Sequence, residues 1–432
     1  MITTINNEHK KLNFSSEREQ SQACLNSAEH EKNQGRKVLN VPNLRFKEFE
    51  GEWDKCELGE VATIIGGYAF KSETLNSIGG KYQVVKMGNL YQNQLDLHRS
   101  PSYTDTLTHK AENVILQKDD IAITLTGTNN KRDFGYTYIF NDEKNLLLNQ
   151  RCGLIRAKGN PYFLSCLLKT HTFLNQFFES ATGGTGNQAN VSTKAMEMFS
   201  VNTPSLKEQE KIGQLMALLD ERIATQNKII EDLKRLKSAI IEIEYTPNTK
   251  TTSHIGNVIE QISKRNKNNA IQNVLSVSNR QGFIKQSDQF ENRNVASEDT
   301  SNYKIVEKND FAFKPARINV GSIARLTTFE KGIVSPMYIC FRTQENVAPE
   351  YIDFFFESKH FYCEIQKRLE GSVRQCLSFE GLCNIPFSLP SLEMQQRIGK
   401  RLFTLGQKIK TETDLLELLN KQKQYLLRQM FI

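Results

Sequence analysis

Two stretches of this 432-residue chain are versions of one sequence. Pro204-Ser205-Leu206-Lys207-Glu208-Gln209-Glu210-Lys211-Ile212-Gly213 returns 186 residues later as Pro390-Ser391-Leu392-Glu393-Met394-Gln395-Gln396-Arg397-Ile398-Gly399. A period this long indicates a duplicated domain rather than a solenoid of short repeats. We therefore expect two similar globular units, each followed by one copy of this segment.

The similarity continues upstream of both segments at about the same offset. The matching stretches are Leu58-Gly59-Glu60-Val61 with Ile255-Gly256-Asn257-Val258, Asp120-Ile121-Ala122 with Asp310-Phe311-Ala312, Arg156 with Arg342, Pro161-Tyr162-Phe163-Leu164 with Pro349-Glu350-Tyr351-Ile352, and Val191-Ser192 with Leu377-Ser378. Because the matches are spread along the whole unit, the duplication extends well beyond the long segments.

Each repeated segment has the pattern of a long helix. Ser205 and Glu208 have the spacing of a capping box, which predicts a helix start near Leu206, and Pro247 predicts its end near Tyr245. Apolar residues then recur at coiled-coil spacing, on a seam of Ile212, Leu215, Leu219, Ile229, Leu233, Leu236 and Ile240, and in the second copy on Ile398, Leu402, Leu405, Ile409, Leu416, Leu419 and Leu426, up to the C-terminus. A helix of roughly 40 residues spans about 60 Å.

An amphipathic helix of this length needs a partner for its apolar face. Since the chain has two, we expect them to pack together as antiparallel coiled-coil helices, with a pseudo-twofold relation between the halves. Polar residues on the seam, Gln226 with Arg222 and Glu412 with Lys408, would set the register. The alternative is that each helix docks on its own globular unit.

The remainder of each unit predicts an α+β fold. Short apolar runs at 82–87, 120–125 and 152–156 are typical of strands, as are those at 310–313, 333–334 and 337–341. One apolar helix is expected in each unit, Pro161 to Phe178 and Pro349 to Leu369. The expected domains are a polar, disordered tail at 1–40, a globular unit at 41–203, a helix at 204–245, a second unit at 246–389 and a second helix at 390–432.

Composition limits the classes of protein. Lysine and arginine total 56 against 49 acidic residues, which permits an anionic partner without requiring one. There is no apolar run of about 18 residues and no secretory signal, so we expect a cytoplasmic protein. The eight cysteines form no C-x-x-C pair and are interpreted as buried thiols.

No catalytic or metal-binding motif is present. The sequence has no P-loop, no H-E-x-x-H, and no zinc spacing among its seven histidines. Asn160-Pro161-Tyr162-Phe163 resembles the N-P-P-[YF] motif of amino-methyltransferases but lacks the second proline, and it is interpreted as a helix start. Gly183-Gly184-Thr185-Gly186 is interpreted as a loop rather than a phosphate cradle. We therefore predict no catalytic residue, no metal and no cofactor in this chain.

Loops at strand ends instead carry residues suited to DNA. Arginine, asparagine and glutamine can bond base edges, and lysine can bond phosphates. The candidate contacts are Thr126, Thr128, Asn129, Lys131, Arg132, Asn187, Gln188 and Asn190 in the first unit, and Lys314, Arg317, Asn319, Arg374 and Gln375 in the second. The same residues also occur in ordinary solvated loops, but both units place them at matching positions.

These features together resemble the specificity subunit of type I restriction-modification systems. The resemblance rests on Val41-Pro42-Asn43-Leu44-Arg45-Phe46, the twice-used P-S-L-x-x-Q-x-[KR]-I-G, Asn319-Val320-Gly321-Ser322-Ile323 and Gly332-Ile333-Val334-Ser335-Pro336-Met337-Tyr338, and it covers nearly all of the chain from residue 41. It implies two target recognition domains, each reading one half of an asymmetric bipartite site in double-stranded DNA, joined by helices that set the spacer. The first 40 residues have no counterpart in the repeat.

The resemblance also implies partners. Two methyltransferase subunits would dock on this chain and methylate adenine with S-adenosylmethionine, and two restriction subunits, which use ATP with Mg, can join them. The chain itself would be a non-catalytic subunit within an adenine-N6 methyltransferase and ATP-dependent endonuclease.

Two other functions are compatible with the residues alone. One is a stand-alone DNA-modifying enzyme with a degenerate motif, and the other is a coiled-coil assembly protein whose units bind protein. The modest net charge further predicts weak DNA binding by this subunit alone.

Overall fold

A computed structural model describes residues 40–183, 188–246, 253–279, 281–289, 299–371 and 375–432, with the backbone alone at Asn129, Asp288 and Gln289. The predicted tail therefore lies outside the described residues, apart from Asn40. The chain divides into two compact units, Met1–Ala217 with Lys423–Ile432 (unit 1) and Leu218–Gln422 (unit 2). In the described part of the chain, no helix is long and apolar enough to cross a membrane.

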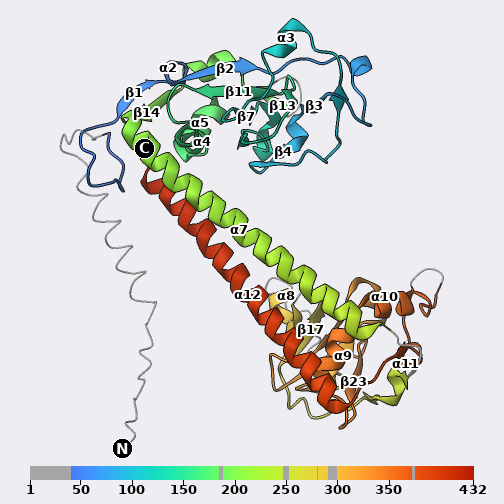
Figure 1. Ribbon diagram of the computed structural model, residues 1–432. Coiled ribbons are helices and arrows are strands. Elements are labelled where there is room, and N and C mark those ends of the chain that lie inside the picture. The colour runs from blue at the N-terminus through green and yellow to red at the C-terminus, as the bar shows by residue number, and fades with distance from the viewer. Residues whose placement is uncertain (1–39, 184–187, 247–252, 280, 290–298, 372–374) are drawn as a thin grey trace, which may run out of the picture. The chain divides into compact units, whose positions relative to one another are not determined.

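Two long helices dominate the chain, α7 (Leu206–Tyr245) and α12 (Leu392–Gln429) (Figure 1). Both begin at the residue that follows Pro-Ser, and α7 ends at the predicted residue. Within unit 2 they run antiparallel, because Gln226 Nε2 donates to the Glu412 backbone oxygen at 3.0 Å while Arg401 lies 3.9 Å from Glu244. The predicted pairing of the helices is confirmed there.

Burial differs between the seam residues predicted on α12 and those predicted on α7. All seven seam residues predicted on α12 are buried or half-buried, and so are Ile212, Leu215, Leu219, Leu233 and Ile240 on α7. Ile229 and Leu236, however, are 40% and 50% exposed, while Ile230 is 5% exposed and Ile223 is half-buried. Residues three and four positions apart lie on the same helix face, so the apolar pattern fits two neighbouring positions almost equally well. In this part of α7 the inward-facing residue is the one after the predicted residue, as with Ile230 after Ile229.

Unit 1 contains a four-stranded antiparallel sheet in the order β2-β11-β7-β9 and a three-stranded sheet β10-β3-β6 in which β10 and β3 are parallel. The strands are β1 (Asp54–Glu57), β2 (Ala62–Gly66), β3 (Tyr82–Val85), β4 (Leu90–Tyr91), β5 (Gln94–Leu95), β6 (Tyr103–Thr104), β7 (Ile121–Thr124), β8 (Thr126–Thr128), β9 (Thr137–Ile139), β10 (Leu146–Leu148), β11 (Cys152–Ala157), β12 (Thr182–Gly183), β13 (Gln188–Asn190) and β14 (Ser200–Thr203), with short helices α2 (Leu58–Val61), α3 (His109–Glu112), α4 (Pro161–Leu167), α5 (His171–Glu179) and α6 (Thr193–Glu197).

Unit 2 repeats this plan. Its four-stranded antiparallel sheet has the order β16-β23-β20-β21, and its second sheet, β18-β17-β22-β19, again contains one parallel pair, β17 with β22. The strands are β15 (Ser253–His254), β16 (Ile259–Ile262), β17 (Val274–Ser278), β18 (Gly282–Lys285), β19 (Lys304–Glu307), β20 (Phe311–Phe313), β21 (Ile323–Arg325), β22 (Lys331–Val334), β23 (Ile339–Thr343) and β24 (Pro386–Phe387), with helices α8 (Gln286–Gln289), α9 (Pro349–Phe355), α10 (Lys359–Gln366) and α11 (Phe379–Cys383). The matching strand orders confirm the duplicated α+β fold.

An ion pair between a buried aspartate and a partly exposed arginine occupies the same place in both four-stranded sheets. Arg156 on β11 binds both carboxylate oxygens of Asp120, at 2.9 and 3.2 Å, and Arg342 on β23 binds both of Asp310, each at 3.1 Å. Burial raises the pKa of Asp310, an effect that its bond to Arg342 opposes, and the same bond raises the pKa of Arg342. The Asp and Arg echoes in the sequence therefore mark a structural element rather than a binding site.

The repeated helix start docks each long helix on its unit. Gln209 Nε2 donates to Pro204 O at 2.9 Å and its Oε1 accepts from Asn160 N at 3.3 Å. In unit 2, Gln395 bonds Pro390 O and Ala348 N in the same way, both at 2.9 Å. The glutamine of the repeated motif thus ties the helix start to the helix that follows the four-stranded sheet.

The single apolar helix predicted in each unit is two helices in the structure. Thr170 separates α4 from α5 and its Oγ1 accepts from Phe173 N at 3.3 Å, and Ser358 separates α9 from α10 and accepts from Phe361 N at 3.1 Å. A hydroxyl that caps a new helix start favours a break at these positions.

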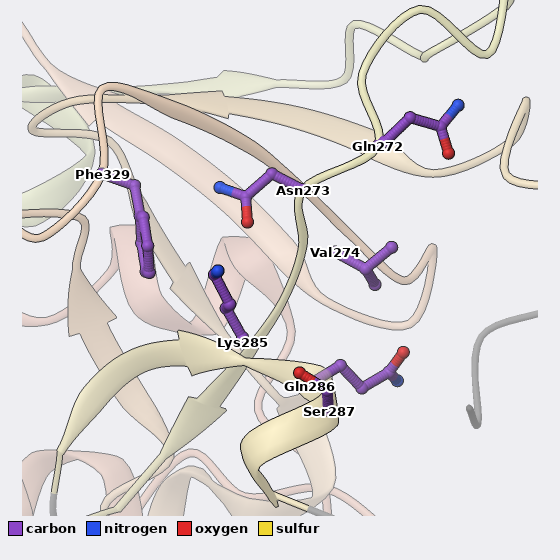
Figure 2. Close-up of a pocket in the computed structure, with 7 residues that line it drawn as sticks. All are labelled: Gln272, Asn273, Val274, Lys285, Gln286, Ser287 and Phe329. Atoms are coloured by element: carbon purple, nitrogen blue, oxygen red, sulfur yellow. The ribbon is translucent and has the colours of Figure 1, made fainter. Parts of the chain in front are cut away.

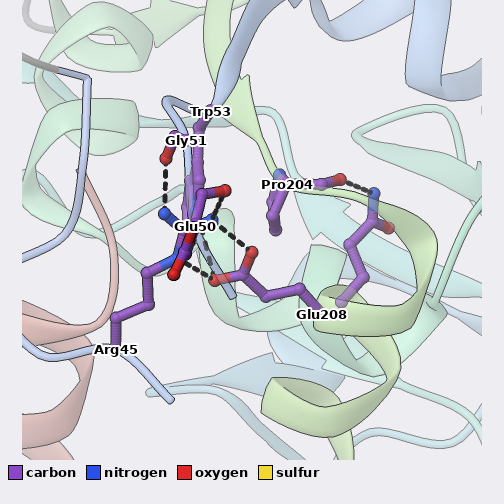
Figure 3. A network of polar contacts seen from close by, with 7 residues as sticks. Arg45, Glu50, Gly51, Trp53, Pro204 and Glu208 are labelled. Atoms are coloured by element: carbon purple, nitrogen blue, oxygen red, sulfur yellow. Dashed lines mark hydrogen bonds and ion pairs between the residues drawn. The ribbon is translucent and has the colours of Figure 1, made fainter. Parts of the chain in front are cut away.

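The N-terminal segment of unit 1 closes over the start of α7 (Figure 3). Arg45 binds both carboxylate oxygens of Glu208, at 2.8 and 2.7 Å, and Trp53 Nε1 donates to the same carboxylate at 3.4 Å. The predicted capping box is therefore wrong, because the Glu208 carboxylate bonds Arg45 and Trp53 instead of the Ser205 backbone. The Phe431 ring stacks on Phe163 beside Trp53, so the C-terminus also belongs to this core.

Candidate nucleic-acid interface

The two loops predicted to contact DNA in unit 1 form one small sheet. Strand β13 pairs antiparallel with β8, with Gln188 opposite Thr128 and Asn190 opposite Thr126, and β12 pairs with the other edge of β13. The chain segments are about 60 residues apart, yet Val191 N donates to Leu125 O at 3.0 Å at their base. Asn187 lies outside the described residues.

Side chains alternate along β13 as they do in a half-buried strand. Gln188 and Asn190 are exposed, and Ala189 between them is fully buried. Thr126 is only 7% exposed and its Oγ1 donates to Asn190 Oδ1 at 3.0 Å. Thr126 therefore positions Asn190, and its role as a direct DNA contact stays a prediction from the sequence.

The turn after β8 fixes two cations. Thr128 N donates to Asp133 Oδ1 at 2.6 Å, and Arg132 N donates to Thr128 O at 2.9 Å. The Arg132 guanidinium lies 5.1 Å from the centre of the Phe178 ring, a cation–π contact that orients the charge, and both Lys131 and Arg132 are exposed. The turn thus presents positive charge beside the exposed amides of β13.

Unit 2 joins its two candidate loops in the same manner. Leu377 N donates to Pro315 O at 3.2 Å, the counterpart of the Val191–Leu125 bond. The chain after β20 forms a 3₁₀ turn, Pro315–Val320, which ends at Gly321 with a φ of 88°. Gln375 is exposed, Asn319 is half-buried, and Arg374 lies outside the described residues.

Serines explain another part of the repeat. Ser192 Oγ accepts from Ala195 N at 3.1 Å and caps α6, and Ser378 Oγ accepts from Gly381 N at 3.0 Å and caps α11. Each serine follows the residue that closes its loop pair. The repeated pairs Val191-Ser192 and Leu377-Ser378 therefore fix the candidate loops at equivalent places in the two units.

Lys314 and Arg317 line a cavity of about 540 Å³ in unit 2. The described lining residues also include the hydroxyl-bearing side chains Ser276, Ser322 and Tyr338 and the amide of Gln286, and none of them is acidic. No sequence pattern predicts this grouping, because the lining residues come from five separate stretches of chain. A hollow with two cations, hydroxyls and an amide is chemically suited to an anionic, hydrogen-bonding ligand.

The described residues show no cluster of three or more His, Cys, Asp or Glu side chains that could hold a metal ion. Burial raises the pKa of the Cys152 and Cys340 thiols to about 12. Cys166 is also buried, whereas Cys363 is exposed and Cys56, Cys376 and Cys383 are half-buried, so the prediction of buried thiols holds for only some of the described cysteines.

Comparison with known proteins gives a consistent family. The profile described as type I restriction modification DNA specificity domain matches the chain twice, at residues 50–235 and 241–421. The type I restriction enzyme EcoAI specificity subunit of Escherichia coli is 26% identical over 194 residues, which cover 44% of this chain. The chain spans about a third of the length of that protein, 32%.

Two further matches extend over nearly the whole chain. The MjaX protein of Methanocaldococcus jannaschii, which carries the name of a type I restriction enzyme specificity subunit, is 22% identical over 421 residues, 90% of this chain and 93% of that one. The crystal structure of the type I restriction-modification system S subunit from M. genitalium has the same fold, with a TM-score of 0.59 at 15% identity, over 91% of this chain and 99% of that chain. Since the family profile covers most of the sequence in two copies, this chain belongs to the type I restriction modification DNA specificity family, the specificity subunits of type I restriction-modification systems.

Proposed function

We propose that this chain is the non-catalytic subunit that selects the DNA sequence for a type I restriction-modification complex, with each unit reading one half of an asymmetric bipartite site. The observation that supports this most directly is the pair of equivalent loop clusters. Each cluster is closed by the same backbone bond, Val191–Leu125 or Leu377–Pro315, yet the exposed residues differ. Equivalent placement with different side chains is what two readers of two different sequences require.

Exposed and half-buried side chains of the two loop clusters suit base reading and phosphate binding. In unit 1, the amides of Gln188 and Asn190 can bond adenine edges, while Lys131 and Arg132 bind phosphates. In unit 2, Lys314 binds a phosphate and Arg317 bonds a guanine edge, with Asn319 and Gln375 beside them. Thr128, Asn129, Asn187 and Arg374 remain proposed contacts from the sequence.

The complex would contain partners that supply the chemistry. Two methyltransferase subunits dock on this chain, bind S-adenosylmethionine and methylate an adenine flipped out of each half-site. Two restriction subunits with ATP and Mg add cleavage where they are present. The complex acts in the cytoplasm on chromosomal and incoming DNA.

The long helices would set the distance between the half-sites. DNA turns once in about 34 Å, so a reader displaced along the helix also has to rotate around it. A pair of helices of 40 and 38 residues, held in register by Gln226 and Glu412, is long enough to fix such a separation.

Methylation mapping tests the proposal. DNA from cells that contain the methyltransferase partner, with and without this gene, is mapped for methyladenine by single-molecule sequencing. We expect one motif, split into two short halves by a fixed gap, that appears only with the gene. A partner that methylates actively but yields no gene-dependent motif would contradict the proposal, and binding of S-adenosylmethionine by the isolated chain would favour a stand-alone enzyme.

Lengthening the helices tests the spacer. Seven residues, two turns, are inserted into α7 after Lys228 and into α12 after Lys410, which lie on the same side of the Gln226–Glu412 contact because the helices are antiparallel. The insertion adds about 10 Å, so we expect a gap longer by about three base pairs with both half-sites unchanged. An unchanged gap would exclude the helices as the spacer.

A further inference from the structure

A short hairpin of unit 1 has no role in the site described above. Strands β4 and β5 pair antiparallel, and the two residues between them, Gln92 and Asn93, have φ values of 50° and 61°. Positive φ at both central residues is the mark of the tight hairpin turn that fits the twist of paired strands, and it is costly for residues other than glycine. A turn held in this conformation without glycine requires support from its surroundings.

That support comes from both ends of the hairpin. At the base, the buried Asn89 donates through Nδ2 to Asp96 O at 2.9 Å and Arg99 O at 2.7 Å. At the tip, Asn93 Oδ1 accepts from Thr137 N at 2.8 Å, which fixes the turn to the start of β9. The hairpin is therefore rigid, and its side chains are presented in fixed directions.

The exposed side of the hairpin carries a cation, an aromatic ring and two amides. Tyr91 is 49% exposed, and the Arg99 guanidinium lies 5.8 Å from the centre of its ring. Gln92 and Gln94 are exposed. This is the combination of base-bonding and phosphate-bonding groups found on DNA-reading surfaces.

The hairpin lies at the same end of the four-stranded sheet as the loops of unit 1. The Tyr91 ring packs edge-on against Tyr136, with ring centres 5.4 Å apart. Tyr136 N donates to Thr124 Oγ1 at 3.0 Å, and Thr124 is the last residue of β7, two residues before β8 begins at Thr126. Two contacts therefore connect the hairpin to the strand end from which the first candidate loop leaves.

In unit 2 the strand that corresponds to β3 is β17, which pairs with β18, and a polar hollow lies at the end of β18 that is away from the turn. The end of β18 and the start of α8 place Lys285, Gln286 and Ser287 around a cavity of about 600 Å³, lined also by Gln272, Asn273, Val274 and Phe329 (Figure 2). Figure 2 shows the Lys285 ammonium directed toward Asn273. None of the described lining residues is acidic.

Gln286 connects this cavity to the candidate DNA contacts of unit 2. It lines both this hollow and the cavity of about 540 Å³ that contains Lys314 and Arg317. Lys285 is exposed, and within the described residues it has no carboxylate partner. The two hollows thus form adjoining parts of one positively charged, amide-bearing surface.

We infer that the β4–β5 hairpin of unit 1 and the junction of β18 with α8 in unit 2 are a second DNA-contacting element in each unit, in which Gln92, Gln94 and Gln286 bond base edges and Arg99 and Lys285 bond backbone phosphates. The inference rests on the proposed function and extends it to residues outside the loops. Each half-site would then be read by a loop cluster and one of these two segments together.

The test uses the complete complex with its methyltransferase partner. Q92A/Q94A in unit 1 and K285A/Q286A in unit 2 are compared with Q117A and Q344A, which change exposed glutamines at the opposite ends of β7 and β23. We expect each double variant to lower methylation about tenfold, with altered preference in one half-site only and a different half for each variant. The two control variants should methylate as the unchanged complex does.

A second measurement separates DNA contact from folding. For R99Q and K285Q, we expect the slope of log binding constant against log salt to fall by about 1, the loss of one phosphate contact, which a folding defect would not produce. The inference would be overturned if the variants kept both their methylation activity and the salt dependence of DNA binding. It would also be overturned if the variants lost the methyltransferase subunits on gel filtration while the salt dependence of DNA binding stayed normal. If the unchanged complex already lacks a bipartite motif, the proposed function fails instead, so the two failures are distinguishable.

Discussion

The two units have kept the same framework and changed almost everything that faces outward from it. The Arg156–Asp120 and Arg342–Asp310 pairs and the Gln209 and Gln395 bridges match atom for atom, and the backbone bonds that close the loop clusters recur. The exposed residues of those clusters differ throughout. Duplication therefore retained what holds a sheet on a helix and left the loops free to diverge, which is the division expected of a scaffold that carries two different readers.

Not every framework position is equivalent, and the least equivalent is the third residue of the long helices. Glu208 is 1% exposed and bonded to Arg45 and Trp53, whereas its counterpart Met394 is half-buried and contacts Arg397. The hydrogen bond to Glu208 raises the pKa of Arg45, which remains a cation. Exchanging Glu208 and Met394 by mutation tests whether this difference affects the stability of each unit.

We expect E208M to lower the free energy of unfolding by about 3 kcal/mol, the low end for breaking a buried pair, because Arg45 keeps its bonds to the carbonyls of Glu50 and Gly51. Trp53 is the single tryptophan of the chain and lies in this network, so urea unfolding followed by its fluorescence measures the effect directly. The matched M394E should cost less than about 1 kcal/mol by circular dichroism, since Arg397 can pair with it. Equal losses for both variants would show that the network has no special role in unit 1.

The glycines of the repeated motif differ in how tightly they pack. A Cβ on Gly213 would collide with Asn160 Oδ1, the atom that caps α4 by accepting from Phe163 N at 2.8 Å. A Cβ on Gly399 would meet the Glu350 Cβ at 2.9 Å, with the Tyr351 N and Glu350 C atoms in ordinary contact at 3.7 and 3.8 Å. We expect G213A to cost about 2 kcal/mol, from overpacking and a weakened cap less the gain in helix propensity.

G399A is its control and should cost less than G213A, about 1 kcal/mol, because the contact with the Glu350 Cβ requires a slight shift of α9 and the helix-propensity gain offsets part of that cost. Urea midpoints of the two variants provide the measurement. If G399A lowered the free energy of unfolding more than G213A, the close contact between Gly213 and Asn160 would not explain why the motif has a glycine at this position.

The sequence predicted the framework well because its signals are local. Proline and serine mark both long-helix starts, Pro247 marks one end, and the 186-residue offset made the duplication visible. It misplaced Ile229 and Leu236 because neighbours three and four residues away share a helix face. It joined α4 to α5 although Thr170 carried the signal for a break, since the apolar pattern continued across it.

The candidate site was predicted less completely. Strand ends and side-chain chemistry located the loops that β8 and β13 bring together, but burial of Thr126 depends on tertiary pairing that no local pattern shows. The β4–β5 hairpin was missed because two-residue strands have no periodicity and its turn, Gln92-Asn93, lacks the usual glycine. Cavities built from several distant stretches give no sequence signal at all.

If the diverged loops recognise the DNA bases, mutation of the loops in one unit should leave recognition of the other unit's half-site unchanged. We expect Q188A/N190A in unit 1 and R317A in unit 2 each to lower methylation about tenfold, which corresponds to about 1.4 kcal/mol. Each variant should also accept other bases at one or two positions of the half-site that its own unit reads, while the sequence of the other half-site stays the same. Motif mapping of DNA from cells that express each variant with the methyltransferase partner measures this. Loss of both halves at once would indicate a general contact rather than a reader.

The smallest effect is expected where equivalent positions of the two copies meet. Gln226 and Glu412 are 186 residues apart, the period of the repeat, and Gln226 is 6% exposed on the helix seam. A polar residue on such a seam fixes register at a cost in stability, so Q226L should raise the free energy of unfolding by about 1 kcal/mol, while Glu412 keeps its ion pair with Lys408 at 2.5 Å. If the glutamine sets register, the stabilised variant should also methylate sites with more than one gap length, which motif mapping would show, and N227L on the exposed side of α7 should do neither. A more stable Q226L complex that still recognises one gap would mean that packing of the apolar seam alone holds the helices in register.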